Sequence, residues 1–254
     1  MRLHFTLLLF CLLLSGPAAA LDFRVTYIDR DATPYITGEG VEVPPRPGAA
    51  VDLVRRVATE LGANVRFERR PAKRVMAALH AGEADALLGR IYTPEMGREL
   101  AFPLRADGQP DPAGGLGVLS YRFYRLPGAE ITWDGRRLGS TVPRPVIGLN
   151  SSTTIAALLQ RLGAEPAEAY SSSQLFGMLM ARRFQAVAAL EVIGDRYAAL
   201  KLERLDPPLA SFDFYLPVTK AFQAAQPDFV ARLWRRLGES RDAVYDELLP
   251  LYLN

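Results

Sequence analysis

Hydrophobic positions along this chain fall into two similar blocks, about one hundred residues apart. In residues 51–62 and again in 153–163, apolar side chains recur at the spacing of an amphipathic helix, and each stretch ends in Leu-Gly before an alanine. The segments that follow correspond in order: extended residues 65–70 and 166–172, helical residues 73–81 and 174–181, and apolar strands 84–88 and 184–188. A β-α-β-α-β unit used twice predicts an α/β protein of two small lobes with a cleft between them.

Two more segments are expected to cross between these lobes. The apolar and aromatic residues 118–124 follow a stretch rich in proline and glycine and predict the crossing into lobe two. Residues 213–219 predict the return crossing, because they follow an expected Asp-Pro-Pro turn at residues 206–208. The opening strand at residues 21–28 and the long loop at 29–48 are expected in lobe one.

The end of the chain is predicted to return to lobe one. Two amphipathic helices, residues 227–237 and 241–251, come after the return crossing. Lobe one is therefore expected to be discontinuous, with residues 21–117 plus 218–254. Lobe two is expected to contain residues 118–217 together with the crossing strands.

Residues 1–20 have the pattern of a cleaved secretory signal. Arg2 precedes an apolar run at residues 7–14, and alanines at 18–20 form the cleavage site. The apolar run is too short to span a bilayer. The one cysteine, Cys11, lies in this run, so cleavage would leave no thiol for disulfides, catalysis or metal binding. We therefore expect a protein exported to the periplasm.

The remaining composition argues against nucleic-acid binding and against catalysis. The formal net charge is +2 at pH 7, which indicates no polyanionic partner. After residue 20 the sole histidine is His80, in a predicted helix. Phosphate-binding loops, zinc motifs and Ser-His-Asp sets are absent from the sequence. We expect no metal, no cofactor and no catalytic residue.

Several short motifs occur in a fixed order along the chain. They are Ala-Gly-Glu-Ala-Asp-Ala-Leu-Leu-Gly-Arg-Ile-Tyr-Thr-Pro-Glu at 81–95, Leu-Ala-Phe-Pro at 100–103, and Ile-Gly-Leu-Asn at 147–150. This set resembles the bacterial extracellular solute-binding proteins of family 3, over nearly all of the chain after residue 20. The resemblance implies the two-lobed type II periplasmic binding protein fold and an amino acid or related small polar solute as ligand. It also implies an ABC permease or a membrane sensor as partner, and a monomer is expected.

At three places the chain departs from the pattern of that family. The family's arginine, which binds the ligand carboxylate through two hydrogen bonds, is replaced by Met96. The acid that holds the ligand's amine aligns with Leu190 or Glu191, and the aromatic residue after the second strand is absent at residues 71–72. The resemblance therefore implies the scaffold of a divergent member and leaves the ligand open.

Ligands of doubly wound sheets lie beyond the carboxyl ends of the strands. Applied to both lobes, this rule selects the ligand-binding candidates Tyr35, Arg70, Lys73, Arg90, Tyr92, Thr93, Ser152, Thr153, Thr154 and Glu191. Tyr35 is predicted to form an aromatic wall. Arg90 directly follows an apolar strand and is predicted to replace the missing arginine as an anion clamp. The alternative for Arg90 is a surface ion pair with Glu95 or Asp29.

Other candidates also have two interpretations. Residues 152–154 begin a helix whose free N–H groups favour an anion, although serine or threonine there is also an ordinary N-cap. Glu191 follows an apolar strand, where an unpaired charge is costly. It is predicted to bind a cation or amine, or else to favour the helix that follows it. Lys73 opens a helix, where its charge opposes the dipole, so it is a candidate contact for an acidic ligand. The alternative, which we favour for Lys73, is a solvated helix face.

Two functional classes follow from these features. The first, which we favour, is a non-catalytic periplasmic receptor that closes on a small polar solute and delivers or reports it to a membrane partner. The second is an enzyme on the same scaffold. The cyclohexadienyl dehydratases, which act on prephenate or arogenate, resemble these receptors, and Glu191 would then supply the acid.

Overall fold

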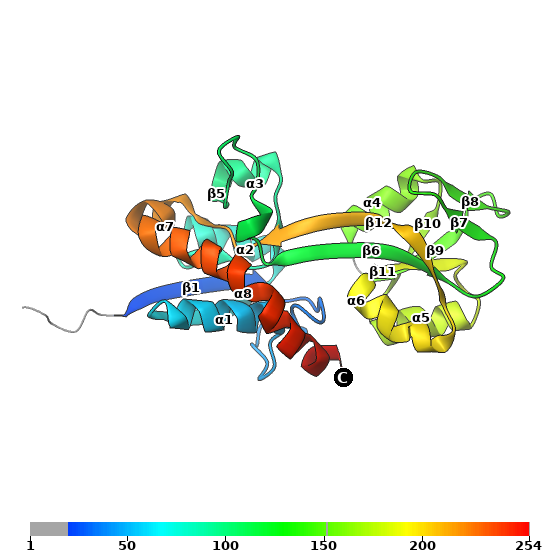
Figure 1. The fold of residues 1–254 in the computed structure, drawn as a ribbon, viewed down its shortest axis with the longest axis horizontal. Coiled ribbons are helices and arrows are strands. Elements are labelled where there is room, and N and C mark those ends of the chain that lie inside the picture. The colour runs from blue at the N-terminus through cyan, green and yellow to red at the C-terminus, as the bar shows by residue number, and fades with distance from the viewer. Residues whose placement is uncertain (1–19, 151, 254) are drawn as a thin grey trace, which may run out of the picture.

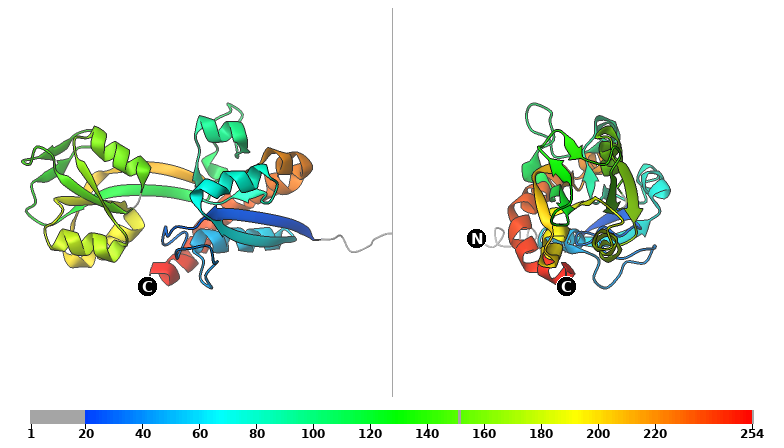
Figure 2. Two further views of the ribbon diagram at one scale, coloured as in Figure 1. Left: turned by 180° about the vertical axis from the view of Figure 1, so that it is seen from behind. Right: turned by 90° about the vertical axis from the view of Figure 1, so that its right-hand side faces the viewer.

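The protein consists of two separate lobes joined by two long strands (Figures 1 and 2). This computed structural model describes residues 20–150 and 152–253. The predicted signal segment, apart from its last residue, lies outside the described residues. The two-lobed α/β architecture predicted from the repeat is confirmed.

Lobe one is a five-stranded sheet with helices on both faces. Its strands are β1 (Leu21–Ile28), β2 (Ala63–Arg70), β3 (Ala86–Leu87), β5 (Leu100–Ala101) and β13 (Val218–Thr219), and its helical elements are α1 (Ala49–Glu60), α2 (Ala72–His80), α3 (Pro94–Glu99), η1 (Pro112–Gly114), α7 (Lys220–Ala225) and α8 (Pro227–Leu253). The strand order is β2-β1-β3-β13-β5, with β1 parallel to β2 and β3. Phe23, Val25 and Tyr27 alternate along β1 and are buried in the core that the sheet forms with α1 and α8.

Lobe two repeats this arrangement. It contains β6 (Gly117–Arg125), β7 (Ile131–Trp133), β8 (Leu138–Ser140), β9 (Val146–Asn150), β10 (Glu165–Ala169), β11 (Ala186–Leu190) and β12 (Glu203–Tyr215), with α4 (Thr153–Arg161), α5 (Ser172–Met180), α6 (Glu191–Gly194) and η2 (Asp195–Leu200). The order β10-β9-β11 matches the order β2-β1-β3 of lobe one, so both copies of the repeat form the same parallel unit. The sheet continues through β6 and β12 to the short strand β4 (Arg90–Ile91).

Strands β6 and β12 form the hinge between the lobes (Figure 1). They pair antiparallel along their length, with a register shift between Leu205 and Ala210. The turn expected at residues 206–208 is wrong, because these residues lie within β12. Their two prolines have no N–H to donate to the ladder, and the shifted register accommodates them. The return crossing therefore starts earlier than residues 213–219, at Glu203.

The prediction of two closing helices is also wrong. Residues 227–237 and 241–251 belong to one helix, α8, which runs through Gly238 without a break. This glycine serves close packing rather than a helix end. A Cβ built on Gly238 would lie 1.6 Å from the carbonyl oxygen of Ala113 in η1, so only glycine allows the two backbones to approach.

We expect Gly238→Ala to lower the free energy of unfolding by about 1–3 kcal/mol, the usual cost of overpacking. Gly177→Ala in α5 is the matched control, since nothing lies within 4 Å of a Cβ at that exposed position. Alanine should stabilise that helix by about 0.5–1 kcal/mol. Urea denaturation of both variants measures the difference. Equal effects of the two substitutions would contradict the packing assigned to Gly238.

None of the helices in the described part of the chain has the length and apolar character needed to cross a membrane.

Strand β4 belongs by sequence to the part of the chain assigned to lobe one, yet it pairs with β12 in the sheet of lobe two. The expected limits of the two lobes therefore remain a prediction: residues 21–117 plus 218–254 for lobe one, and residues 118–217 for lobe two.

Candidate functional site

The carboxyl ends of the parallel strands face each other across the hinge. Strand β6 leads from lobe one into lobe two, and β11 runs antiparallel to it, so β11 points back toward lobe one. Strands β9 and β10 are parallel to β11. In lobe one, β1 runs toward lobe two (Figure 1). The ends that carry the predicted ligand-binding residues thus lie on two facing edges, where ligands of such sheets bind.

Arg90 presents a positive charge that has no partner. Its side chain is half-buried on β4, opposite Tyr215 of the hinge strand β12. The buried Nε has no hydrogen-bond partner, and the described residues place neither Glu95, Asp29 nor any other acid within ion-pair distance of the guanidinium. Burial lowers the pKa of Arg90, which is the mark of a desolvated cation. A bound anion would compensate this charge, and Arg90 is thus the strongest anion-binding candidate.

Tyr35 lies next to the hinge at the edge of lobe one. Its ring packs edge-on against Phe214, with centroids 5.1 Å apart, and against Tyr245 of α8, at 5.5 Å. Burial raises the pKa of the Tyr35 hydroxyl. The ring is only partly buried, so it is a fixed aromatic surface beside the hinge, as a ligand wall requires.

Tyr92 and Thr93 both make contacts within the protein that hold their side chains in place. The ring of Tyr92 packs edge-on against Phe102, at 5.2 Å. Thr93 caps α3, because its hydroxyl accepts the N–H of Met96 at 3.2 Å. Met96 itself packs against the apolar cluster around Phe102 and Leu100. The family's arginine position is thus occupied by a packing residue.

The two basic candidates near the end of β2 differ in their contacts. The guanidinium of Arg70 is already paired with Glu68 at 2.6 Å and with Glu83 at 2.7 Å. The hydrogen bond that Arg70 donates to Glu68 is the main cause that raises the pKa of Arg70, ahead of the smaller contribution from Glu83. Lys73 is exposed in the first turn of α2. Arg70 would have to give up an ion pair to bind a ligand.

The N-terminus of α4 is capped by its own chain. The hydroxyl of Ser152 accepts the N–H of Ile155 at 3.3 Å, which is the N-cap interpretation. Thr153 and Thr154 are exposed. The side chain of Ser152 also contacts that of Tyr121 on β6. Burial raises the pKa of Tyr121, and the hydrogen bond with Ser152 offsets part of that shift.

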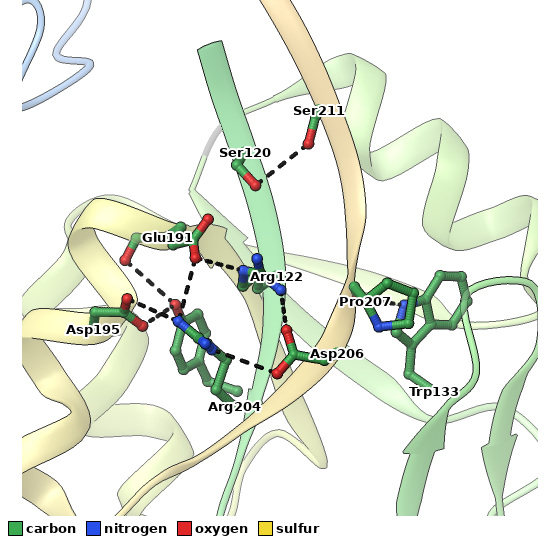
Figure 3. Close-up of polar contacts among 10 residues, drawn as sticks. Ser120, Arg122, Trp133, Glu191, Asp195, Arg204, Asp206, Pro207 and Ser211 are labelled. Carbon is green, nitrogen blue, oxygen red and sulfur yellow. Dashed lines mark hydrogen bonds and ion pairs between the residues drawn. The ribbon is translucent and has the colours of Figure 1, made fainter. Parts of the chain in front are cut away.

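Glu191 lies at the end of β11 in a group of charged side chains (Figure 3). Its Oε1 is 2.8 Å from Nε of Arg122 and 3.2 Å from Nη1 of Arg204. The contact with Arg122 is an ion pair rather than a directed hydrogen bond, since that Nε has no acceptor in line. Asp195 and Asp206 complete the group.

Sequence reasoning missed both arginines of this group. Arg122 is a charged residue inside the otherwise apolar and aromatic crossing strand, and that position was the signal for it. Arg204 follows the expected end of lobe two's repeat and carries no comparable signal. Arg122 lies within reach of Glu191 because β6 pairs with β11, where Arg122 is opposite Ala189. Arg204 lies within reach because β12 begins at Glu203, earlier than expected.

Grooves on the surface of the described residues lie elsewhere. One, of about 470 Å³, lies between α1 and α8 and is lined by Asp52, Arg55, Arg56, Thr59, Glu60 and Leu248. Another, of about 350 Å³, lies beside β2 and includes one predicted site residue, Arg70. Over residues 20–150 and 152–253, histidine and acidic side chains form no group suited to a metal ion.

The structure thus distributes the predicted residues over two facing edges. Tyr35, Arg70, Lys73, Tyr92 and Thr93 lie on lobe one, Arg90 lies on β4 opposite the lobe-one end of the hinge strand β12, and Ser152, Thr153, Thr154 and Glu191 lie on lobe two. Among the described residues, no hydrogen bond or ion pair joins a member of the first set to a member of the second. Any ligand that contacts both sets would have to bridge the lobes.

Comparison with solved structures identifies proteins with a similar fold. The chain is similar to an ancestral cationic amino acid solute-binding protein, with a TM-score of 0.65 and 18% identity over 92% of this chain and 96% of the other. It is also similar to a probable amino-acid ABC transporter extracellular-binding protein from Bacillus subtilis, with a TM-score of 0.64 and 13% identity over 91% and 98% of the two chains.

A histidine kinase sensor domain similar to periplasmic binding proteins has a TM-score of 0.59 and 17% identity over 91% and 96% of the two chains. No protein-family model matches the chain, and no curated protein matches it in sequence. At these identities the likeness establishes the two-lobed periplasmic binding protein fold.

Proposed function

We propose that this protein is a periplasmic receptor that closes on a small polar solute, an amino acid or a related small acid. The observation that carries the proposal is the half-buried guanidinium of Arg90, which has no partner among the described residues and lies on one of two facing strand edges. Over residues 20–150 and 152–253, the strands that join the lobes are β6 and β12 alone, so the lobes can rotate about the hinge. A ligand that contacts both lobes would stabilise the closed state.

The proposed partner is a membrane protein, either an ABC permease or a sensor. The similar proteins include one of each kind, an ABC transporter binding protein and a histidine kinase sensor domain. We propose further that the chain acts as a monomer after removal of residues 1–20. Loss of that segment on export from cells would support the periplasmic location.

A second candidate function is the dehydratase. One structure of the ancestral binder is described as a precursor of cyclohexadienyl dehydratase, so this scaffold has been a starting point for catalysis. A general acid must reach the atom to which it gives a proton. The Oε1 of Glu191 faces Arg122 and Arg204 instead, and this favours the receptor.

The two functions are separated by the fate of the ligand. We expect a solute from a panel of amino acids, carboxylic acids, sugars and polyamines to raise the melting temperature of the purified protein. Nuclear magnetic resonance of the mixture should then show the solute unchanged after prolonged incubation. Steady conversion of prephenate or arogenate, lost in Glu191→Gln, would establish the dehydratase and overturn the receptor.

A further inference from the structure

We infer that the solute is a small carboxylic acid, or a similar organic anion, that carries no ammonium group. The inference rests on the proposed function and narrows its ligand class. It comes from the distribution of charge on the two facing edges. The acid at the end of β11 is already paired with cations, whereas the cation at the start of β4 has no acidic partner in the described part of the chain.

The first step concerns Glu191. It begins α6 directly after β11, on the edge of lobe two that faces lobe one. It follows Leu190, which pairs with Tyr121 of the hinge strand β6. Both ion pairs converge on its Oε1. A ligand ammonium that approached this carboxylate would come within a few ångströms of two guanidinium groups, and like charges at that range repel.

The second step is that Arg122 is held in place. Its side chain is only 13% exposed and lies between Glu191 and Asp206, with an ion pair to each. It projects from β6, which is paired on one side with β11 and on the other with β12. Moving the guanidinium aside would leave a buried cation with fewer partners, which is costly. Arg122 therefore remains next to Glu191 when a ligand arrives.

The third step is the balance of charge in this group. Arg122 and Arg204 face three acids, so the group carries one excess negative charge. We assign that excess to Asp206 and Asp195, which lie on β12 and at the start of η2. Their side chains are also more exposed, 60% and 46% against 31% for Glu191. Water screens them, and they offer nothing to a ligand between the lobes.

The fourth step is the opposite edge. Arg90 is a desolvated cation without a partner among the described residues, and a carboxylate would give it charge-assisted hydrogen bonds. The loop after β1 on this edge carries two aspartates, and one of them, Asp29, is half-exposed. It is the residue that a ligand ammonium would use if the inference were wrong. Asp31 is engaged with Thr33 and with the N–H of Gly38.

The test compares ligand pairs that differ only in the α-ammonium group. Calorimetry would measure succinate against aspartate, glutarate against glutamate, and propionate against alanine, with arginine and a sugar panel as further probes. We expect the best des-amino acid to bind at least tenfold more tightly than its amino acid. Tighter binding of the amino acid, or binding of only a cation or a sugar, overturns this inference and leaves the receptor function intact. Failure of the whole panel to bind contradicts both.

Two variants test the role given to the charged group. In Glu191→Gln the affinity for the acid should stay within about threefold of wild type or increase, because Arg122 gains freedom to face the ligand. Glu203→Gln, which removes a similar ion pair with Arg125 at the lobe-two end of β6 and β12, is the matched control. In Arg122→Gln the ratio of the affinities for the acid and for the amino acid should fall at least fivefold, because Glu191 loses its ion pair with Arg122. A tenfold loss of affinity in Glu191→Gln refutes the inference, even if Arg122→Gln does not fold.

Discussion

Asp85→Ala is expected to lower the free energy of unfolding by about 2–3 kcal/mol, since it removes a buried carboxylate that accepts several hydrogen bonds from a charged partner. The carboxylate accepts the backbone N–H of Arg24 at 2.8 Å, its Nε at 3.0 Å and its Nη2 at 2.6 Å. Alanine would leave these donors unmet at the junction of β1 and β3. The side chain of Asp85 is only 10% exposed, so water cannot fully replace it.

The matched control is Asp22→Ala, on the same strand as Arg24. Asp22 is 64% exposed and its ion pair with Arg66 is 4.0 Å long, so its removal should change stability by less than about 0.5 kcal/mol. Chemical denaturation followed by circular dichroism measures both variants. Similar small losses of stability in the two variants would show that Asp85 does not stabilise the pairing of β3 with β1.

Arg90→Ala should weaken binding of an anionic solute by about 1.5–3 kcal/mol, the range for a hydrogen bond to a charged group. The same change should leave the ligand-free protein as stable as wild type or more stable, because it removes a desolvated cation that has no partner among the described residues. Groups kept for binding often cost stability in this way. Calorimetry and thermal unfolding measure the two effects separately.

Arg98→Ala is the control for this prediction. Arg98 lies on α3, is 71% exposed and is paired only with Glu95 at 3.6 Å, so neither affinity nor stability should change measurably. Wild-type affinity in Arg90→Ala would remove Arg90 from the site. A large loss of stability in the same variant would mean that it has a structural partner instead.

The lobes could be predicted from the chain because their signals are local and occur twice. Helix periodicity, the Leu-Gly endings and the apolar strands at 84–88 and 184–188 each appear in both halves. The length of the hinge strands and the single last helix could not be predicted from the chain, because both depend on contacts between elements that are far apart in the sequence. Prolines at 207 and 208 resemble a turn until β6 supplies a partner strand that tolerates a register shift. Gly238 resembles a helix end until η1 packs against it.

The candidate site shows the same division. The rule on strand ends placed Arg90 and Glu191 on the facing edges, since it depends only on where strands stop. The sequence did not reveal that Glu191 has two arginine partners and Arg90 no partner among the described residues. Those partnerships depend on side chains that are 69 residues apart in the case of Arg122 and Glu191. Whether the chosen residues bind a ligand stays a prediction.

Closure of the two lobes on a ligand is the central claim, and small-angle X-ray scattering tests it most directly. The ligand-free protein should give the radius of gyration of two separated lobes, as in Figure 1. A saturating solute that raises the melting temperature should reduce this radius measurably, and the same solute should leave Arg90→Ala in its extended form at the same concentration. A radius that does not change while calorimetry shows the solute bound would contradict closure.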